Sequence, residues 1–87
     1  MKKSLMYMRK VFGGRLNRSR DLYVYEDEFC DIIVEKINEV YVCKTRNYEF
    51  GFKFNKYEII QDIDEVVELV DNWIVDYCAS ARGIFFK

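Results

Sequence analysis

The strongest pattern in this sequence is a helical repeat of apolar residues in its last third. Apolar side chains recur there at spacings of three and four, as in an amphipathic helix with one buried face. These positions are Ile63, Val66, Val67, Val70, Trp73, Ile74, Tyr77 and Cys78. Asp62 and Glu65 fit a capping box at the start, and Gly83 fits a helix end. The repeat predicts a helix over about 62–81, followed by a short strand or packed terminus at 84–87.

A second pattern alternates aromatic with polar residues or glycine, which is the repeat of a β-strand. The aromatic positions are Tyr48, Phe50, Phe52 and Phe54. Aromatic stripes at strand spacing usually pack inward, so we expect this one to be buried against a helix. Two more strands are expected at 40–44 and 22–25, with a turn at 45–47 that joins 40–44 to the aromatic strand.

Residues 28–38 are compatible with two folds, both of the α+β class with a small antiparallel sheet packed by the C-terminal helix. As a helix, this stretch gives the order β-α-β-β-α-β from residue 21 onward, a ferredoxin-like plan. As a strand that ends in a turn at Asn38-Glu39, it gives a β-meander covered by the C-terminal helix. Polar residues segregate better on a helical wheel, so the ferredoxin-like plan is preferred. The β-branched run Ile32-Ile33-Val34 keeps the meander as the alternative.

Charge divides the chain into two parts. Residues 1–20 hold seven basic residues and no acid, whereas residues 21–87 hold seven basic and fifteen acidic residues. We therefore expect a basic N-terminal segment, 1–20, followed by a single compact α+β domain, 21–87, with a small core. Such a split indicates a charged partner, which is either another molecule or the other half of the same chain.

The basic segment has few structural signals of its own. Gly13-Gly14 predicts a turn, after a short helix or strand that ends at Phe12 and before a basic connection to Asp21. Arg9 and Lys10 interrupt the first apolar run too early for a secretory signal. No stretch of the sequence approaches the length of apolar residues that spans a membrane.

The predicted C-terminal helix carries an acidic solvent face. Its members are Asp64, Glu65, Glu68, Asp71 and Asp76. Like charges three or four residues apart destabilise a helix by about 0.2–0.5 kcal/mol per pair. The positive end of the helix dipole offsets this cost only for Asp64 and Glu65. We expect such a face either to meet a cationic partner or simply to be solvated, with about equal weight.

The basic segment has three possible binding partners. Its candidate binding residues are Arg9, Lys10, Arg15, Arg18 and Arg20. They could neutralise the phosphates of a nucleic acid, dock on an acidic protein, or lie on the acidic helix of the same chain. The last possibility would account for the repulsion that the helix tolerates.

No catalytic or metal site is predicted. The sequence has no histidine and no CxxC pair, so a structural zinc site would lack its four nitrogen or sulfur ligands. Nothing supplies a nucleophile with an adjacent base, so we expect neither an enzyme nor a cofactor. Cys30, Cys43 and Cys78 are interpreted as reduced core residues of a cytoplasmic protein.

The stretch KFNKYEIIQDIDEVVELVDNW, from Lys53 to Trp73, is a strand that runs into an acidic helix. Through this stretch, and in its overall size and composition, the chain resembles small proteins of Gram-positive phages and mobile elements, a group that includes anti-CRISPR inhibitors. The resemblance implies a non-enzymatic inhibitor or adaptor in the host cytoplasm. Such a protein docks its acidic helix face on a basic surface of a nucleic-acid-handling protein, for instance a nuclease.

The basic segment departs from a purely acidic nucleic-acid mimic. The alternative is therefore a nucleic-acid-binding protein that uses residues 9–20, with the acidic domain turned away. A third arrangement is a homodimer in which the basic segment of one chain lies on the acidic helix of the other.

Overall fold

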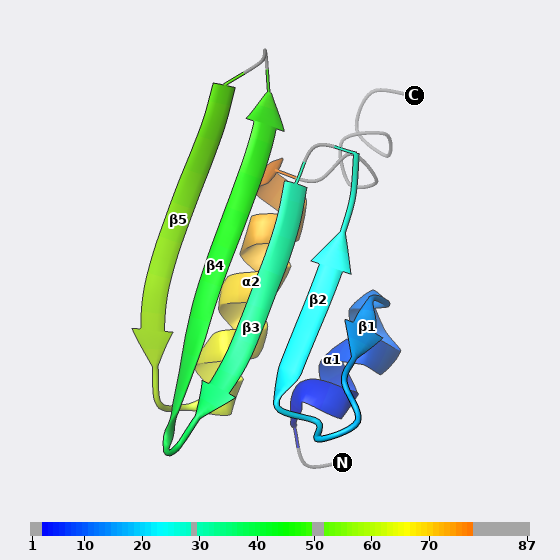
Figure 1. The fold of residues 1–87 in the computed structure, drawn as a ribbon, viewed down its shortest axis with the longest axis vertical. Coiled ribbons are helices and arrows are strands. Elements are labelled where there is room, and N and C mark those ends of the chain that lie inside the picture. The colour runs from blue at the N-terminus through cyan, green and yellow to red at the C-terminus, as the bar shows by residue number, and fades with distance from the viewer. Residues whose placement is uncertain (1–2, 29, 50–51, 78–87) are drawn as a thin grey trace.

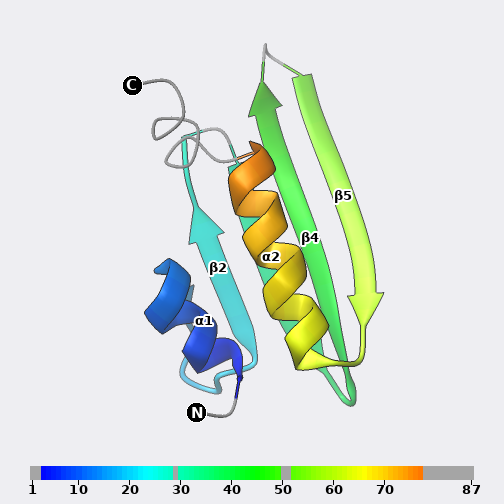
Figure 2. The ribbon, with the colours of Figure 1, turned by 180° about the vertical axis from the view of Figure 1, so that it is seen from behind.

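The computed structural model describes residues 3–28, 30–49 and 52–77. These residues form a sheet with helices on one side, drawn from the sheet side in Figure 1 and from the helix side in Figure 2. In chain order the elements are α1 (Leu5–Phe12), β1 (Arg15–Leu16), β2 (Leu22–Glu26), β3 (Cys30–Ile37), β4 (Val40–Glu49), β5 (Phe52–Ile60) and α2 (Ile63–Tyr77).

The sheet is an antiparallel meander with the strand order β1-β2-β3-β4-β5. Each strand pairs antiparallel with the next one in the sequence. The preferred ferredoxin-like order is therefore wrong, and the alternative meander covered by a C-terminal helix is confirmed.

The error lies in residues 28–38, where a strand replaces the preferred helix. Cys30, Ile32 and Val34 are fully buried, while the residues between them are half-buried on the other face. This period of two suits a strand with one face on the core, and β-branched side chains fit a pleated surface well. The expected turn at Asn38-Glu39 is present, and Asn38 adopts a positive φ of 56° that asparagine tolerates.

The hairpin that follows is longer than expected, and its turn lies further along the chain. The turn predicted at 45–47 is wrong, because β4 runs to Glu49 and pairs with β3 as far as Asn47. Thr45 is buried in the middle of that strand, so the chain cannot reverse there. The expected aromatic strand is divided between β4 and β5, with Glu49 opposite Phe52. The side chains of Tyr48, Phe50, Phe52 and Phe54 lie outside the described residues.

Helix α2 begins where the sequence predicts. The Asp62 carboxylate accepts a hydrogen bond from the backbone N–H of Asp64 at 3.1 Å, the role of an N-cap. The apolar repeat faces the sheet, with Val66, Val70 and Trp73 buried. The predicted continuation beyond Tyr77 and the expected terminal strand lie outside the described residues.

The basic segment forms part of the same structure as the rest of the chain. Ser4 caps α1, since its hydroxyl accepts from the Tyr7 N–H at 3.2 Å, and Gly13 ends the helix with a φ of 83°. After Gly14 the chain enters the sheet as β1, which pairs with β2. Of the two expected forms up to Phe12, a short helix or a strand, the structure has the helix, and the expected basic connection contains an edge strand.

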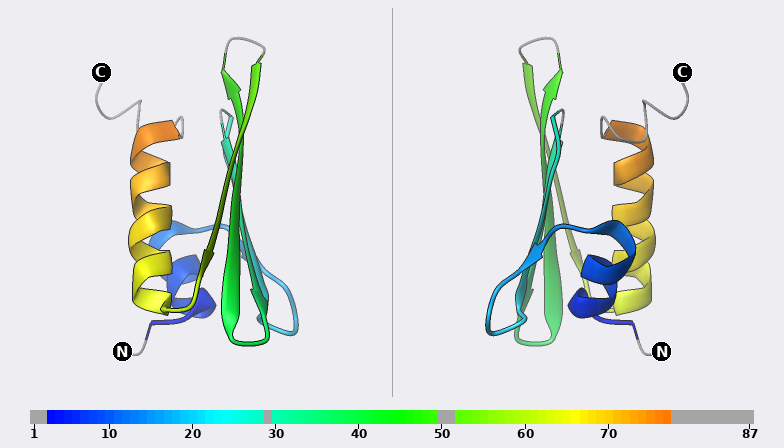
Figure 3. Two further views of the ribbon diagram at one scale, coloured as in Figure 1. Left: turned by 90° about the vertical axis from the view of Figure 1, so that its left-hand side faces the viewer. Right: turned by 90° about the vertical axis from the view of Figure 1, so that its right-hand side faces the viewer.

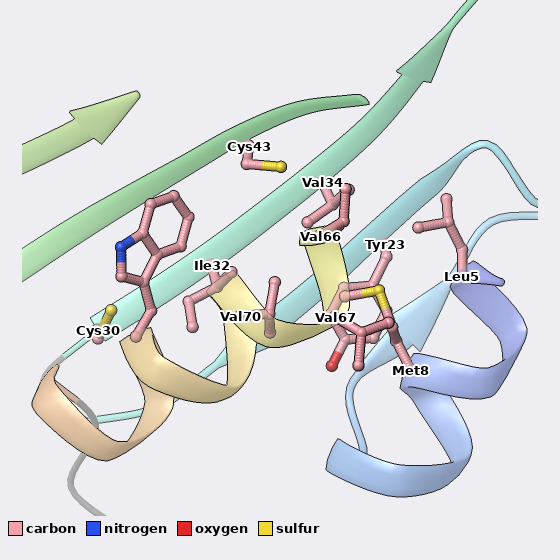
Figure 4. Packing of buried hydrophobic residues seen from close by; sticks show 11 residues of the cluster. Leu5, Met8, Tyr23, Cys30, Ile32, Val34, Cys43, Val66, Val67 and Val70 are labelled. Carbon is pink, nitrogen blue, oxygen red and sulfur yellow. The ribbon is translucent and has the colours of Figure 1, made fainter. Parts of the chain in front are cut away.

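One core lies between the helices and the sheet. Figure 3 shows α1 and α2 in one layer on the same side of the sheet. In Figure 4, Met8 of α1 lies beside Val67 of α2 and Tyr23 of β2. Eleven buried side chains make up the cluster: Leu5, Met8, Tyr23, Cys30, Ile32, Val34, Cys43, Val66, Val67, Val70 and Trp73. Within the described residues, no helix covers the other face of the sheet.

Candidate functional site

The acidic residues of α2 divide into two groups. An α-helix turns about 100° per residue, so its exposed arc has two flanks. Asp64, Glu68 and Asp71 share the flank toward α1, while Glu65 and Asp76 lie on the opposite flank. All five side chains are exposed. The structure thus brings together only three of the five predicted residues as one site.

These three carboxylates form one wall of a groove between the two helices. The groove has a volume of about 390 Å³. Its lining comprises Lys3, Tyr7, Val11, Phe12, Asp64, Val67, Glu68 and Asp71. The opposite wall comes from α1 and is largely apolar, and Val11 is 54% exposed although it is aliphatic. The groove therefore combines an apolar wall and floor with an acidic wall, and we call it the acidic groove.

Among the described residues, cations neutralise this groove only at one end. Lys3 Nζ lies 3.9 Å from Asp64 Oδ1, and both side chains are well exposed to solvent. Exposed pairs of this kind contribute little, typically 0–1 kcal/mol. Among the described residues, Glu68 and Asp71 form no ion pair. Most of the negative charge on this wall therefore remains available.

The predicted basic residues do not gather on one surface. Arg9 and Lys10 are exposed on α1, in the helix layer. Arg15 lies in β1 and forms an ion pair with Glu26 of β2. Arg18 and Arg20 are exposed in the connection from β1 to β2. That connection projects on the side of the sheet away from the helices (Figure 3).

Sequence reasoning missed a second site on the open face of the sheet. A hollow of about 310 Å³ lies around the exposed ring of Tyr57. It is lined by Ile33, Lys44, Thr45, Arg46, Lys56 and Tyr57. The spacing of Lys44 and Arg46 is a usable signal, because residues two apart in a strand share a face. The sequence analysis placed Arg46 in a turn at 45–47, where side chains do not alternate between two faces, so the shared face of Lys44 and Arg46 was not predicted.

No arrangement typical of catalysis appears in the described part of the chain. Within residues 3–28, 30–49 and 52–77, no three histidine, cysteine or acidic side chains meet as a metal site. Cys30 and Cys43 are buried free thiols. Burial, with a smaller contribution from the Glu58 carboxylate, raises the pKa of Cys43 to about 12. A thiol with such a pKa is protonated at neutral pH and is a poor nucleophile.

None of the helices formed by the described residues has the length and apolar character needed to cross a bilayer.

Comparison with protein-family profiles, with curated proteins and with solved structures finds no significant match to this chain. The fold defines its class as a small α+β protein with two helices on one face of a β-meander. Within the described residues, the acidic groove and the open face of the sheet are the surfaces with a distinctive chemical character.

Proposed function

We propose that this chain is a non-enzymatic binding protein that docks its acidic groove on a basic surface of a nucleic-acid-handling protein. The observation that carries the proposal is the exposed wall of Asp64, Glu68 and Asp71, which the cations of the described residues leave largely unneutralised. An inhibitor or adaptor of the anti-CRISPR kind would use such a surface to occupy a nucleic-acid-binding groove.

The groove suits a cationic side chain carried on an apolar stem. Arginine fits best, because its planar guanidinium can bond a carboxylate with two N–H groups while its stem packs on apolar surface. Tyr7, Val11 and Val67 supply that apolar surface beside the carboxylates. A basic groove that normally holds nucleic acid presents several such side chains. The expected contact therefore combines charge pairing with burial of exposed apolar area.

The repulsion inside the acidic wall supports the same interpretation. Glu68 lies four residues after Asp64 and three before Asp71, so both pairs place like charges next to each other on the helix. Each pair costs about 0.2–0.5 kcal/mol in the free protein. A bound cation relieves that cost, and it also speeds the encounter, because oppositely charged surfaces attract each other at long range.

Charge reversal at the groove tests the proposal. We expect Glu68→Lys with Asp71→Lys to abolish partner binding, because the reversed wall repels a basic surface. The measurement uses the tagged protein as bait in a nuclease-treated lysate of a Gram-positive bacterium, with captured proteins identified by mass spectrometry. Nuclease treatment removes proteins that are bridged by nucleic acid. Basic nucleic-acid-handling proteins should be captured by the wild type and lost with the variant.

Glu28→Lys with Glu39→Lys is the matched control. Both of these acids are exposed and lie in turns of the sheet, so the variant changes the net charge equally and leaves the groove intact. The control should capture the same proteins as the wild type, and raising the salt concentration should release them. Capture that survives reversal of Glu68 and Asp71 would contradict the proposal.

A further inference from the structure

The open face of the sheet carries a line of residues that crosses all five strands. Directly paired residues in an antiparallel ladder lie on the same face, so the register fixes the line. Its members are Arg15, Val24, Ile33, Lys44 and Tyr57. Four spacings between neighbouring strands make it about 19 Å long. Figure 1 looks directly onto this face. The line has an arginine at one edge, an aliphatic centre, and a lysine and a tyrosine at the other.

The β5 end of this line is the more basic. Lys44 and Arg46 line the hollow beside Tyr57 on this face, and no acidic residue lines it within the described chain. Lys56 lines it too, but it pairs with the buried Thr45 and so belongs to the helix face of the edge strand β5. Tyr57 is 60% exposed, and Ile59 two residues further along β5 is 59% exposed. An exposed aromatic ring beside two cations offers a flat apolar surface together with positive charge.

The loop at residues 17–21 adds a second basic point on the same side of the sheet (Figure 3). The Asn17 side-chain oxygen accepts from the N–H groups of Asp21 and Leu22, at 3.0 and 3.1 Å. The Arg20 N–H donates to the Asn17 carbonyl at 3.1 Å. These bonds restrain the backbone of the loop, so binding through Arg18 and Arg20 costs little backbone entropy.

The acids of this face limit which ligand it can take. Glu26 is paired with Arg15, Asp31 lies opposite Arg46, and Glu35 stands in the middle of the sheet. A polyanion with closely and evenly spaced charges would be repelled by these carboxylates. A ligand with separated negative charges and flat rings between them fits better, because it can place its charges at the two basic points.

We propose that the open face of the sheet binds single-stranded nucleic acid. An unpaired base stacks on Tyr57, Lys44 and Arg46 hold the flanking phosphates, and the strand runs toward Arg18 and Arg20 in the loop at 17–21. Stacking on aromatic side chains combined with a basic track is the general basis of single-strand binding. A duplex fits less well, because its bases are already stacked. This surface lies on the opposite side of the sheet from the acidic groove and works independently of it.

Fluorescence polarisation with labelled 12-nucleotide single strands, oligo-dT and oligo-U, tests the proposal across a range of salt concentrations. Four phosphate contacts, from Lys44, Arg46, Arg18 and Arg20, give a slope of about −2.8 for the logarithm of the binding constant against that of salt. Removing two of them, as Lys44→Gln with Arg46→Gln, should reduce the slope by about 1.4 and weaken binding about five-fold per cation at 0.1 M salt. Tyr57→Ala should weaken binding about ten-fold and leave the slope unchanged.

Arg9→Gln with Lys10→Gln is the matched control, because it removes two exposed cations from the helix layer. It should bind as the wild type does, within two-fold. All three variants change exposed side chains, and thermal melting confirms that each one is folded. No binding of single strands, or an equal loss in the control, would overturn the proposal. Equally tight binding of duplex DNA or of polyglutamate would also overturn it, the latter by making the face a dock for an acidic protein.

Discussion

At the scale of single residues, Cys43 shows how burial changes chemistry. Its thiol is fully buried under α2, and its pKa is raised from 9.0 to about 12 by burial and then by Glu58. In the unfolded chain the thiol ionises near its ordinary value. The folded state therefore holds the proton at pH values where the unfolded state releases it.

This difference predicts a loss of stability in alkali. The contribution of Cys43 is fully present below about pH 9 and is lost as the pH rises toward 12, because the unfolded state gains by ionising first. Urea denaturation between pH 8 and 11 should show a steeper decline for the wild type than for Cys43→Ala. All other side chains are common to the two proteins, so their contributions cancel in the comparison. Parallel declines would contradict the assignment.

Gly14 is the residue at which the backbone path depends most on glycine. Its φ is +95°, and a Cβ atom there would lie 2.6 Å from the carbonyl oxygen of Val24. Gly14→Ala should therefore lower the free energy of unfolding by about 1–3 kcal/mol, measured by chemical denaturation. Gly13→Ala is the matched comparison, since Gly13 has a similar φ of +83° but no atom within 4 Å. If both substitutions cost the same, the contact with β2 does not matter.

At the scale of elements, α1 depends on the core for its existence. A helix of eight residues is too short to be stable alone in water. Leu5 and Met8 are buried with Val67 and Tyr23, and the Tyr23 hydroxyl donates to the Gly13 carbonyl at 2.7 Å. The acidic groove has α1 as one wall, so it exists only while α1 stays in place.

Met8→Ala tests this dependence. Removal of a fully buried methionine side chain should cost about 2–5 kcal/mol, because it leaves a cavity between α1, α2 and β2. Lys10→Ala, an exposed change on the same helix, should stay within about 0.5 kcal/mol of the wild type. Thermal or urea denaturation measures both variants. A small effect of Met8→Ala would mean that α1 does not share the core.

At the scale of the whole molecule, the sheet separates two surfaces of different character. The helix layer carries the acidic groove, while the open face carries Lys44, Arg46 and the loop with Arg18 and Arg20. The two faces do not reproduce the charge split along the sequence, because Lys44 and Arg46 belong to its acidic part. Arg9 and Lys10 remain in the helix layer, and Glu26, Asp31 and Glu35 remain on the open face.

Local patterns were enough to predict α2, but they placed a turn at Asn38-Glu39 only in the alternative meander. The helix is long, its apolar repeat is strict and Asp62 caps it, so local preference and burial agree. The β3 segment was assigned wrongly, because its polar residues also segregate on a helical wheel. The position of the second turn was missed as well, since an aromatic alternation cannot show where one strand ends and the next begins.

The sequence by itself determined the α+β class, the amphipathic α2 and the acidic residues that it exposes, because all of these follow from short-range periodicity. Tertiary structure alone decided which charges meet. Pairing of β3 with both β2 and β4 produced the meander, and packing of α1 through Leu5 and Met8 placed an apolar wall beside Asp64, Glu68 and Asp71. Register between strands then set Lys44 beside Tyr57. These are contacts between residues far apart in the chain, which no local pattern encodes.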